Sequence, residues 1–324
     1  MKKKILITGS SGFLGSHLKK LITNKKRFKS KFKFIFTSSD EYNLLKASSY
    51  EKMFKETKPN YFINLAAYSG GIEANRKYQA DFYYINNLIT TYGFEFAKKY
   101  NVEKVIYTMG GCSYPNSAKS PINENDMWNG LPVTTSLGYS SAKKMSIIAS
   151  YSYKEQYGLN SQILIPGNMY GEYDNFDLNN SHVIPAMIRK FYEAKINNKD
   201  EINFWGTGKP IRDFVYAGDI ARAILFFLNK NKFSDPINLS SGKSISIKKL
   251  SSLLKNISGY KGKINWDLSK PDGQKIKIFD IKRMNDLGFK TSVDINTGLK
   301  KTYKWFSIEY PKKKQSTKAL KGIL

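Results

Sequence analysis

The chain has 324 residues and a formal net charge of +27, with 53 lysine and arginine residues against 26 aspartate and glutamate residues. The single cysteine excludes an internal disulfide and a cysteine-cluster metal site, and only two histidines disfavour a zinc site. No apolar run approaches the roughly 20 residues that span a bilayer, and MKKKILITG turns glycine-rich too soon for a signal peptide. We expect a cytoplasmic globular protein without a metal or membrane insertion.

The positive charge has two interpretations. A basic surface can bind nucleic acid or an anionic membrane. Only six of the 53 basic residues are arginine, which normally leads in reading phosphates and bases, and the lysines are spread along the chain. We interpret the charge as a lysine-rich surface that attracts anionic ligands, and expect no nucleic-acid partner. The basic tail at 312–324 is expected to be a solvated end, with a weak membrane or partner contact as the alternative.

The N-terminal half alternates short apolar strands with helical stretches. This alternation is typical of a parallel, doubly wound sheet with helices on both faces, so the predicted fold class is α/β of the Rossmann type. The strands are expected at residues 4–8, 33–37, 61–66, 105–108 and 162–165.

After Pro166 the pattern loosens into a polar, turn-rich stretch, residues 168–186, as expected of a loop that faces a ligand. We expect residues 1–166 to form the dinucleotide-binding domain, with 214–240 returning to it. Residues 167–213 and 241–324 should form a smaller, interleaved α/β substrate-binding lobe. Further strands are expected at 203–205, 237–239 and 263–266, and helices at 219–228 and 247–257.

A glycine-rich turn follows the first strand. Gly9, Gly12 and Gly15 form G-x-x-G-x-x-G directly before a helical segment. Glycines here permit a tight turn and close backbone approach, and a helix N-terminus can receive a pyrophosphate. A purely structural turn is the alternative. We expect a dinucleotide to bind along the whole turn, whose other members are Ser10, Ser11, Phe13 and Leu14.

The end of the second strand bears on which dinucleotide binds. Thr37, Ser38 and Ser39 place hydroxyls where an acidic residue would grip a ribose 2′-hydroxyl and repel a 2′-phosphate. Asp40 and Glu41 come only later. We expect NADPH, with NAD as the alternative because no arginine clamps the phosphate.

Tyr139 and Lys143 form a Y-x-x-x-K pair, which lies on one face of a helix. A lysine ammonium there can lower the pKa of the neighbouring phenol, so the pair can act as an acid. The spacing also occurs by chance in many helices. Its position after a glycine-type dinucleotide fold favours the catalytic interpretation.

Several longer motifs occur along the chain: AAYSGGIEAN (66–75), CSYP (112–115), NMYGEYDNFDLNNSHVIPA (168–186), FWGTGKPIRDF (204–214) and SKPDGQ (269–274). In these motifs the chain resembles the extended short-chain dehydrogenase/reductases, the NAD-dependent epimerase/dehydratase family, and within them the GDP-L-fucose synthase branch. The resemblance covers nearly the whole chain.

This resemblance implies an NADPH-dependent epimerase/reductase that acts on a GDP-4-keto-6-deoxy sugar. Tyr139 would protonate the oxygen formed when hydride reaches the C4 ketone, and Lys143 would hold the nicotinamide ribose. Cys112 and His182 would move protons at C3 and C5, which the ketone acidifies. Taken singly, Cys112 is more often a small buried hydrophobe and His182 a hydrogen-bonded core residue.

The resemblance also implies binding residues. Ala66, Asn168 and Met169 would line the cofactor. Trp205 would lie against the nucleotide, and Asp272 would contact the sugar-nucleotide. The diphosphate would lie near three cations, Lys190, Arg212 and Lys277, a charge arrangement that suits a doubly anionic ligand.

Two glycines depart from the family pattern. Gly110 stands where a serine or threonine normally polarises the substrate carbonyl, and its loss should slow ketone chemistry by about 10²-fold. Gly167 stands where this branch more often has a hydroxyl. Both changes are expected to enlarge the space at the sugar, which suggests a shifted or bulkier substrate such as a related GDP-deoxyhexose or a GDP-heptose.

Two other functions stay open. One is a 4-epimerase or dehydratase of the same fold that holds NAD tightly. The other is a non-catalytic, nucleotide-sensing or nucleic-acid-binding Rossmann protein. By resemblance, the helices expected at 82–100 and 140–157 would pair into a homodimer, although covering the sheet would require the same amphipathic pattern.

Overall fold

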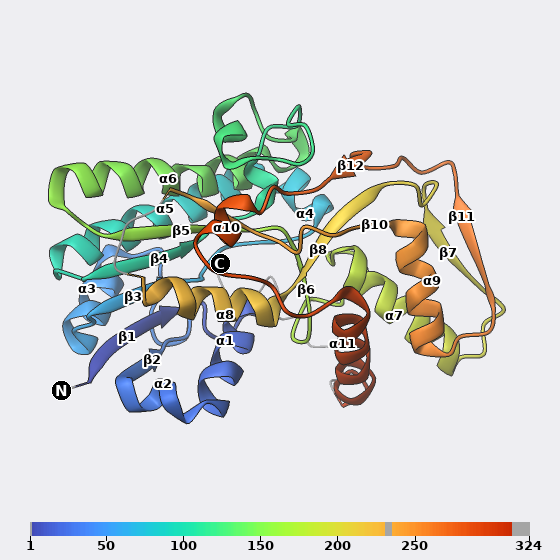
Figure 1. The fold of residues 1–324 in the computed structure, drawn as a ribbon, viewed down its shortest axis with the longest axis horizontal. Helices are drawn as coiled ribbons and strands as arrows, with labels where there is room; N and C mark the ends of the chain where they lie inside the picture. The colour runs from blue at the N-terminus through green and yellow to red at the C-terminus, as the bar shows by residue number, and fades with distance from the viewer. Residues whose placement is uncertain (1, 231–234, 313–324) are drawn as a thin grey trace.

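The computed structural model describes residues 2–230 and 235–312, so all but the first residue of the basic tail lies outside it. Its centre is a six-stranded sheet in the order β2-β1-β3-β4-β5-β9, in which every neighbouring pair is parallel. The predicted Rossmann-type fold is confirmed (Figure 1). The strands are β1 (Lys3–Thr8), β2 (Phe32–Phe36), β3 (Tyr61–Asn64), β4 (Lys104–Thr108), β5 (Ser161–Pro166) and β9 (Ile237–Leu239).

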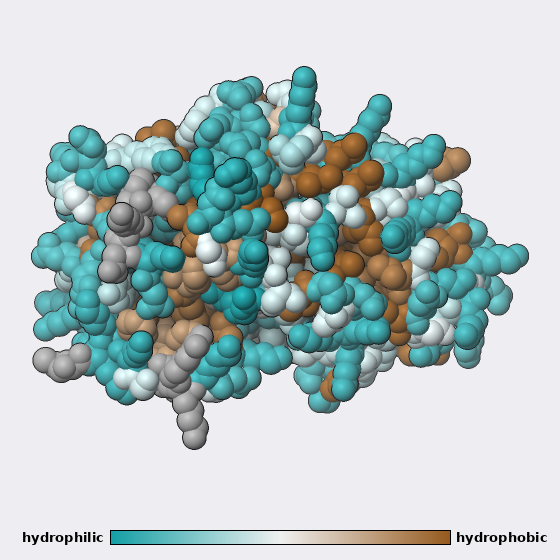
Figure 2. Space-filling model, viewed as in Figure 1, coloured by the Kyte–Doolittle hydropathy of each residue, from teal (hydrophilic) through white to brown (hydrophobic). Residues whose placement is uncertain are grey.

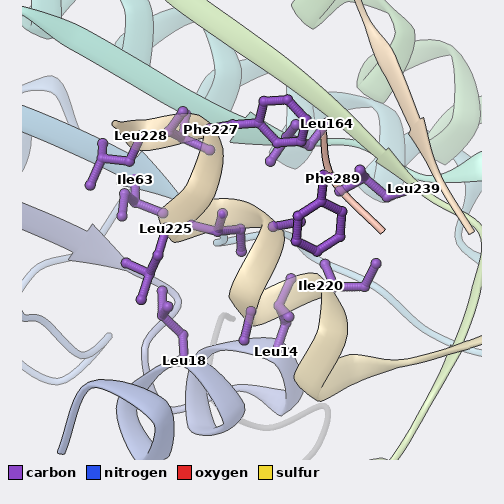
Figure 3. Close-up of a cluster of buried hydrophobic side chains, with 14 of the residues drawn as sticks. Leu14, Leu18, Ile63, Leu164, Ile220, Leu225, Phe227, Leu228, Leu239 and Phe289 are labelled. Atoms are coloured by element: carbon purple, nitrogen blue, oxygen red, sulfur yellow. The ribbon is translucent and has the colours of Figure 1, made fainter. Parts of the chain in front are cut away.

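Helices cover both faces of this sheet. Successive strand residues point to opposite faces, so Ile5 joins one core and Leu6 the other. Figure 3 shows the first core, where apolar side chains of α1 and α8 meet those of the sheet. The first face is covered by α1 (Phe13–Asn24) and α8 (Ala217–Leu228), and the second by α3 (Ala47–Thr57), α5 (Gln79–Lys99) and α6 (Leu137–Tyr157).

The loops after β1 and β3 meet at the carboxyl edge of the sheet. β2 lies on one side of β1 and β3 on the other, so the direction of winding reverses between β1 and β3. The loops are in close contact, because a Cβ added to Gly9 would lie 2.6 Å from the backbone nitrogen of Ala66. Open α/β sheets bind ligands at such a switch point.

A second core, rich in aromatic side chains, lies at the other end of the molecule, on the right in Figure 1. β8 is its central strand; it pairs with β6 and β12 in parallel and with β10 antiparallel, while β7 and β11 form a separate parallel pair. The bounds are β6 (Asn168–Tyr170), β7 (Glu201–Trp205), β8 (Ile211–Tyr216), β10 (Ser244–Ser246), β11 (Lys263–Asp267), β12 (Ile276–Lys277), α7 (Val183–Ile196), α9 (Ile247–Ser258) and α11 (Ile295–Glu309).

The two parts are interleaved. After β8 the chain returns to the main sheet through α8 and β9. Met284 of α10 (Lys282–Asp286) and the nearby Phe289 also pack into the core beneath α8. The segment that contains them was assigned by sequence to the substrate lobe. Its apolar side chains instead complete the cofactor-domain core, so the boundary at residue 241 does not follow the packing there.

The remaining elements are short: α2 (Lys26–Lys31), α4 (Ile72–Lys77), η1 (Gly111–Ser113), η2 (Glu124–Trp128) and η3 (Thr134–Ser136). Hydrophilic side chains cover most of the face drawn in Figure 2. Within residues 2–230 and 235–312, the search for a helix with the length and apolar character needed to cross a bilayer found none. The same residues contain no group of three His, Cys, Asp or Glu placed to hold a metal ion.

Candidate active site

The glycine turn leaves the N-terminus of α1 open. A Cβ on Gly15 would lie 2.2 Å from the carbonyl oxygen of Gly9, so the packing of the turn itself requires glycine there. Gly12 is different, because its backbone is extended and an added Cβ would meet only the Gly9 oxygen, at 3.4 Å. No side chain caps the helix. A residue that the fold does not require to be glycine thus stands before an uncapped helix N-terminus, which fits a bound pyrophosphate.

Hydroxyls at the ends of β1 and β2 hold these two loops together. Ser10 Oγ donates to the Thr37 carbonyl at 2.8 Å, and Thr37 Oγ1 donates to the Ile7 carbonyl at 3.1 Å. Ser38 donates its backbone N–H and its hydroxyl to one oxygen of Glu41, at 2.8 and 3.2 Å. The end of β2 therefore already binds one anionic group, and that group belongs to the chain itself.

Tyr139 and Lys143 lie in the first two turns of α6, but Lys143 is directed to another phenol. The Lys143 side chain is 2% exposed, and its Nζ donates to Tyr107 Oη on β4 at 3.0 Å. The pKa of Tyr139 is raised, first by burial and then by the negative charges that Cys112 and Tyr107 would carry. This is opposite to the lowering predicted from the sequence spacing. Burial decides the direction because the ammonium is hydrogen-bonded to Tyr107.

Cys112 and Tyr139 converge beside Gly110. A Cβ added to Gly110 would lie 3.2 Å from Cys112 Sγ and 3.9 Å from Tyr139 Oη. Cys112 belongs to η1, the turn that follows β4, and its thiol is free. A thiol and a phenol from two distant segments thus face one small region at the carboxyl end of β4.

The space predicted at the two glycines is occupied by protein. At Gly110 it is taken up by Cys112 Sγ. At Gly167 a Cβ would meet Ser240 Oγ at 2.5 Å and the Phe279 ring at 3.1 Å, and at Gly111 the same ring at 2.5 Å. Phe279 is 2% exposed. The expectation of a larger sugar site is therefore wrong at Gly167, because Phe279, which was not singled out from the sequence, packs over Gly111 and Gly167.

His182 stands at the N-cap of α7, at the end of the polar loop. The residue is exposed, yet desolvation by the surrounding protein atoms lowers the pKa of its imidazole. No described residue forms a hydrogen bond with its imidazole. In the same loop, burial raises the pKa of Asp174 to about 7, and Asp174 Oδ2 has no hydrogen-bond partner in the described part of the chain. Asp174 lies inside the DNF motif but was not singled out from the sequence.

Two cations stand side by side near the cysteine. Lys277 of β12 pairs in register with Arg212 of β8. Burial lowers the pKa of Lys277, a negative charge on Cys112 raises it and the Arg212 charge lowers it, so the ammonium lies within electrostatic range of both. Arg212 is held by the Gln274 and Ile211 carbonyls at 2.6 and 2.9 Å. The positive charges of Lys277 and Arg212 therefore lie between the Cys112 thiol and the rest of the second lobe.

The other predicted binding residues differ in whether their side chains already have hydrogen-bond partners in the protein. Trp205 is 69% exposed at the end of β7, with Lys270 Nζ 5.8 Å from its ring centre. Both carboxylate oxygens of Asp272 accept from Thr207, at 2.9 and 2.6 Å. Lys190 Nζ donates to the Asn203 carbonyl at 3.0 Å. Trp205 offers an open ring face, whereas Asp272 and Lys190 already have protein partners.

The remaining predicted cofactor residues line the same edge of the sheet. Ala66 follows β3 and touches the glycine turn. Asn168 begins β6, and its side-chain amide donates to the Asp213 carbonyl at 2.8 Å. Met169 packs against the core below α1 and α8. These residues connect the turn at β1 with the start of the second lobe.

An uncapped helix N-terminus at the switch point of a Rossmann sheet, with a phenol, a thiol and a buried lysine at the carboxyl end of β4 in the same sheet, is the arrangement expected of a dinucleotide-dependent enzyme. Comparison with known proteins agrees. The model of the "NAD dependent epimerase/dehydratase family" matches residues 5–240. The chain belongs to that family.

Relatives of known structure and sequence cover almost the whole chain. GDP-L-fucose synthase 1 of Arabidopsis thaliana is 35% identical over 303 residues, 94% of this chain and 93% of that protein. A GDP-L-fucose synthetase from Naegleria fowleri bound to NADP superposes with a TM-score of 0.88 at 26% identity, covering 97% of each chain. A GDP-D-glycero-L-gluco-heptose synthase from Campylobacter jejuni, crystallised in the presence of NADPH, has a TM-score of 0.86 at 28% identity, covering 94% of this chain and 98% of that one.

Proposed function

We propose that the chain is an NADPH-dependent epimerase/reductase that acts on a GDP-4-keto-6-deoxy sugar, in the manner of a GDP-L-fucose synthase. The observation that carries this proposal is the convergence of Cys112 Sγ and Tyr139 Oη beside Gly110. A proton exchanger and a proton donor at one place suit a sugar that is first epimerised next to a ketone and then reduced at it. The names of the relatives support the same reaction.

In this proposal each residue has one task. NADPH, when bound, supplies the hydride for C4. Tyr139 donates its proton to the C4 oxygen, and Lys143 holds the nicotinamide ribose. Cys112 and His182 remove and return protons at C3 and C5. Arg212 and Lys277 face the diphosphate, and Trp205 offers its ring to the nucleotide.

In this proposal each part of the chain binds one of the two ligands. Residues 1–166 and 214–240 hold the cofactor, and residues 167–213 with most of the segment after 241 hold the GDP-sugar. Because Phe279 fills the space over Gly111 and Gly167, we propose a 6-deoxyhexose rather than a heptose. NADPH must displace Glu41 from Ser38 to place its 2′-phosphate there, so NADH is the natural comparison cofactor.

We also propose a homodimer formed through α5 and α6. These two helices pack against each other and expose apolar side chains to solvent. The exposed set is Tyr83 and Tyr84 on α5, and Met145, Ile148, Tyr151 and Tyr157 on α6. A free thiol with a chemical role requires a reducing compartment, so we place the protein in the cytoplasm.

The proposal is tested with purified protein, GDP-4-keto-6-deoxy-D-mannose and either NADPH or NADH. We expect one NADPH to be consumed per sugar, and NMR of the product to show inverted C3 and C5. The GDP-heptose analogue should react more slowly. Protein that purifies with tightly bound NAD and consumes no NADPH would instead indicate a 4-epimerase or dehydratase.

Gly12 gives a separate test of the cofactor site. Gly12→Ala should fold like the wild type, since its Cβ meets only one atom at 3.4 Å, but should bind NADPH at least about tenfold more weakly because the methyl group stands where the pyrophosphate approaches. Gly15→Ala is the contrasting variant and should lose thermal stability, because its Cβ clashes with backbone. Thermal unfolding and a fluorescence titration with NADPH measure both. Unchanged NADPH affinity in Gly12→Ala would contradict this placement.

A further inference from the structure

A second tyrosine, Tyr107, contacts the ammonium of Lys143. Tyr107 lies on β4 and is 1% exposed, and Lys143 Nζ donates to its hydroxyl at 3.0 Å. The ammonium lies 4.2 Å from the centre of the same ring. No ion pair within the described part of the chain includes Lys143. A buried ammonium needs acceptors, and here a phenol supplies one where a carboxylate does not.

The hydrogen bonds beyond Tyr107 run in one direction. Because an ammonium only donates, Tyr107 Oη accepts from Lys143. Thr90 donates its one hydroxyl proton to the Asn86 carbonyl at 2.8 Å, within α5. In the bond between Tyr107 and Thr90, 2.6 Å long, Tyr107 is therefore the donor and Thr90 Oγ1 the acceptor. The chain of bonds ends on a backbone carbonyl, which cannot deliver a proton. This chain of hydrogen bonds therefore cannot return a proton to a proton donor in the site. Its effect is to fix the position of the Lys143 ammonium.

We propose that Tyr107 is a positioning residue that, with Thr90, fixes the Lys143 ammonium for cofactor binding. This rests on the proposed function, in which Lys143 holds the nicotinamide ribose. The hydrogen bond and the ring face hold the ammonium of Lys143 in one place. Without them, the ammonium loses its acceptor and occupies several rotamers.

The test compares Tyr107→Phe with Tyr50→Phe. Tyr50 is 0% exposed and belongs to the same core, and its hydroxyl donates to the Ile89 carbonyl at 3.2 Å, so the control removes one buried hydroxyl without touching Lys143. Each protein is titrated with NADPH alone at neutral pH, by nucleotide fluorescence. kcat and the KM for NADPH are then measured with GDP-4-keto-6-deoxymannose.

We expect Tyr107→Phe to bind NADPH about ten- to a hundredfold more weakly, which is the contribution of one hydrogen bond from the displaced ammonium to the cofactor. kcat at saturating NADPH should fall less than the affinity, because bound cofactor offers the ammonium another acceptor. Tyr50→Phe should match the wild type in both. Thr90→Val, which keeps the shape but removes the acceptor of the Tyr107 proton, should weaken NADPH binding by less than Tyr107→Phe does.

Equal NADPH affinities of Tyr107→Phe and Tyr50→Phe would overturn the proposal, whatever their thermal stabilities. Should Tyr107→Phe fail to fold, the NADPH affinity of Thr90→Val decides in its place. Failure of the proposed function is distinguishable, because the wild type would then leave the GDP-sugar unreduced while the NADPH titration, which needs no sugar, still reports on Tyr107.

Discussion

Replacing Tyr139 by phenylalanine should lower the turnover of a GDP-4-keto-6-deoxy sugar by about 10²- to 10⁴-fold, the usual contribution of a positioned general acid. Burial raises the pKa of Tyr139, which keeps the phenol in its proton-donating form at neutral pH. That form is the one that reduction of a ketone consumes. The measurement is the rate of NADPH consumption at saturating sugar.

The control for this variant is Tyr114→Phe. Tyr114 is 2% exposed and lies two residues after Cys112, but its hydroxyl donates to Asn238 Oδ1 at 2.6 Å and so serves the fold. It should cost stability and leave kcat close to that of the wild type. The affinity of Tyr139→Phe for NADPH should also stay unchanged. If Tyr139→Phe retained more than about a tenth of the wild-type rate, another group would have to be the acid.

Local patterns in the sequence predicted the main sheet well because each strand is short, apolar and bounded by turn residues. The β4 prediction of residues 105–108 compares with Lys104–Thr108, and the helix predicted at 247–257 is α9, Ile247–Ser258. The second lobe was predicted less completely. β8 and its partners are short strands whose pairing depends on contacts far along the chain, and α7 begins directly after a loop that reads as irregular.

The same distinction applies to the site. Motif spacing indicated Tyr139 and Lys143, and the family resemblance implied Cys112; the structure brings all three to one end of the sheet. Sequence reasoning missed Tyr107, because a tyrosine within an apolar strand is indistinguishable from a core residue. It also missed Phe279, which packs over glycines more than one hundred positions earlier in the chain. Whether the space beside a glycine is empty or is occupied by a side chain from far along the chain depends on the tertiary structure.

The glycine at position 110 bears on how the ketone is polarised. The nearest side chain to its missing Cβ is Cys112, whose thiol is a weak hydrogen-bond donor. Under the proposed function, we expect the carbonyl oxygen to depend more heavily on Tyr139 than it would beside a serine hydroxyl. Lys277, within electrostatic range of Cys112, adds positive charge to the same region. We therefore expect this charge, rather than a second hydroxyl, to assist Tyr139.

Proton exchange at carbon should separate from reduction when Cys112 is replaced. In D₂O and without NADPH, we expect the wild type to incorporate deuterium at C3 and C5 of GDP-4-keto-6-deoxymannose, as followed by NMR. Cys112→Ser should slow this exchange by about 10²-fold or more, because a serine hydroxyl is a far weaker acid than a thiol and forms too little anion to remove a carbon-bound proton. His182→Gln should slow it as well, since an amide does not titrate.

Tyr139→Phe provides the crossed control for this experiment. It should still exchange deuterium, because the bases that exchange the protons, Cys112 and His182, are still present, but more slowly than the wild type, because the enolate oxygen loses a donor. It should consume almost no NADPH, because hydride transfer needs the phenol. If Cys112→Ser exchanged as fast as the wild type, the thiol beside Gly110 would have only a packing role. The exchange would then have to use another base of the polar loop, and Asp174, a buried carboxyl with its pKa raised to about 7 and one oxygen without a partner in the described chain, would be the next group to replace.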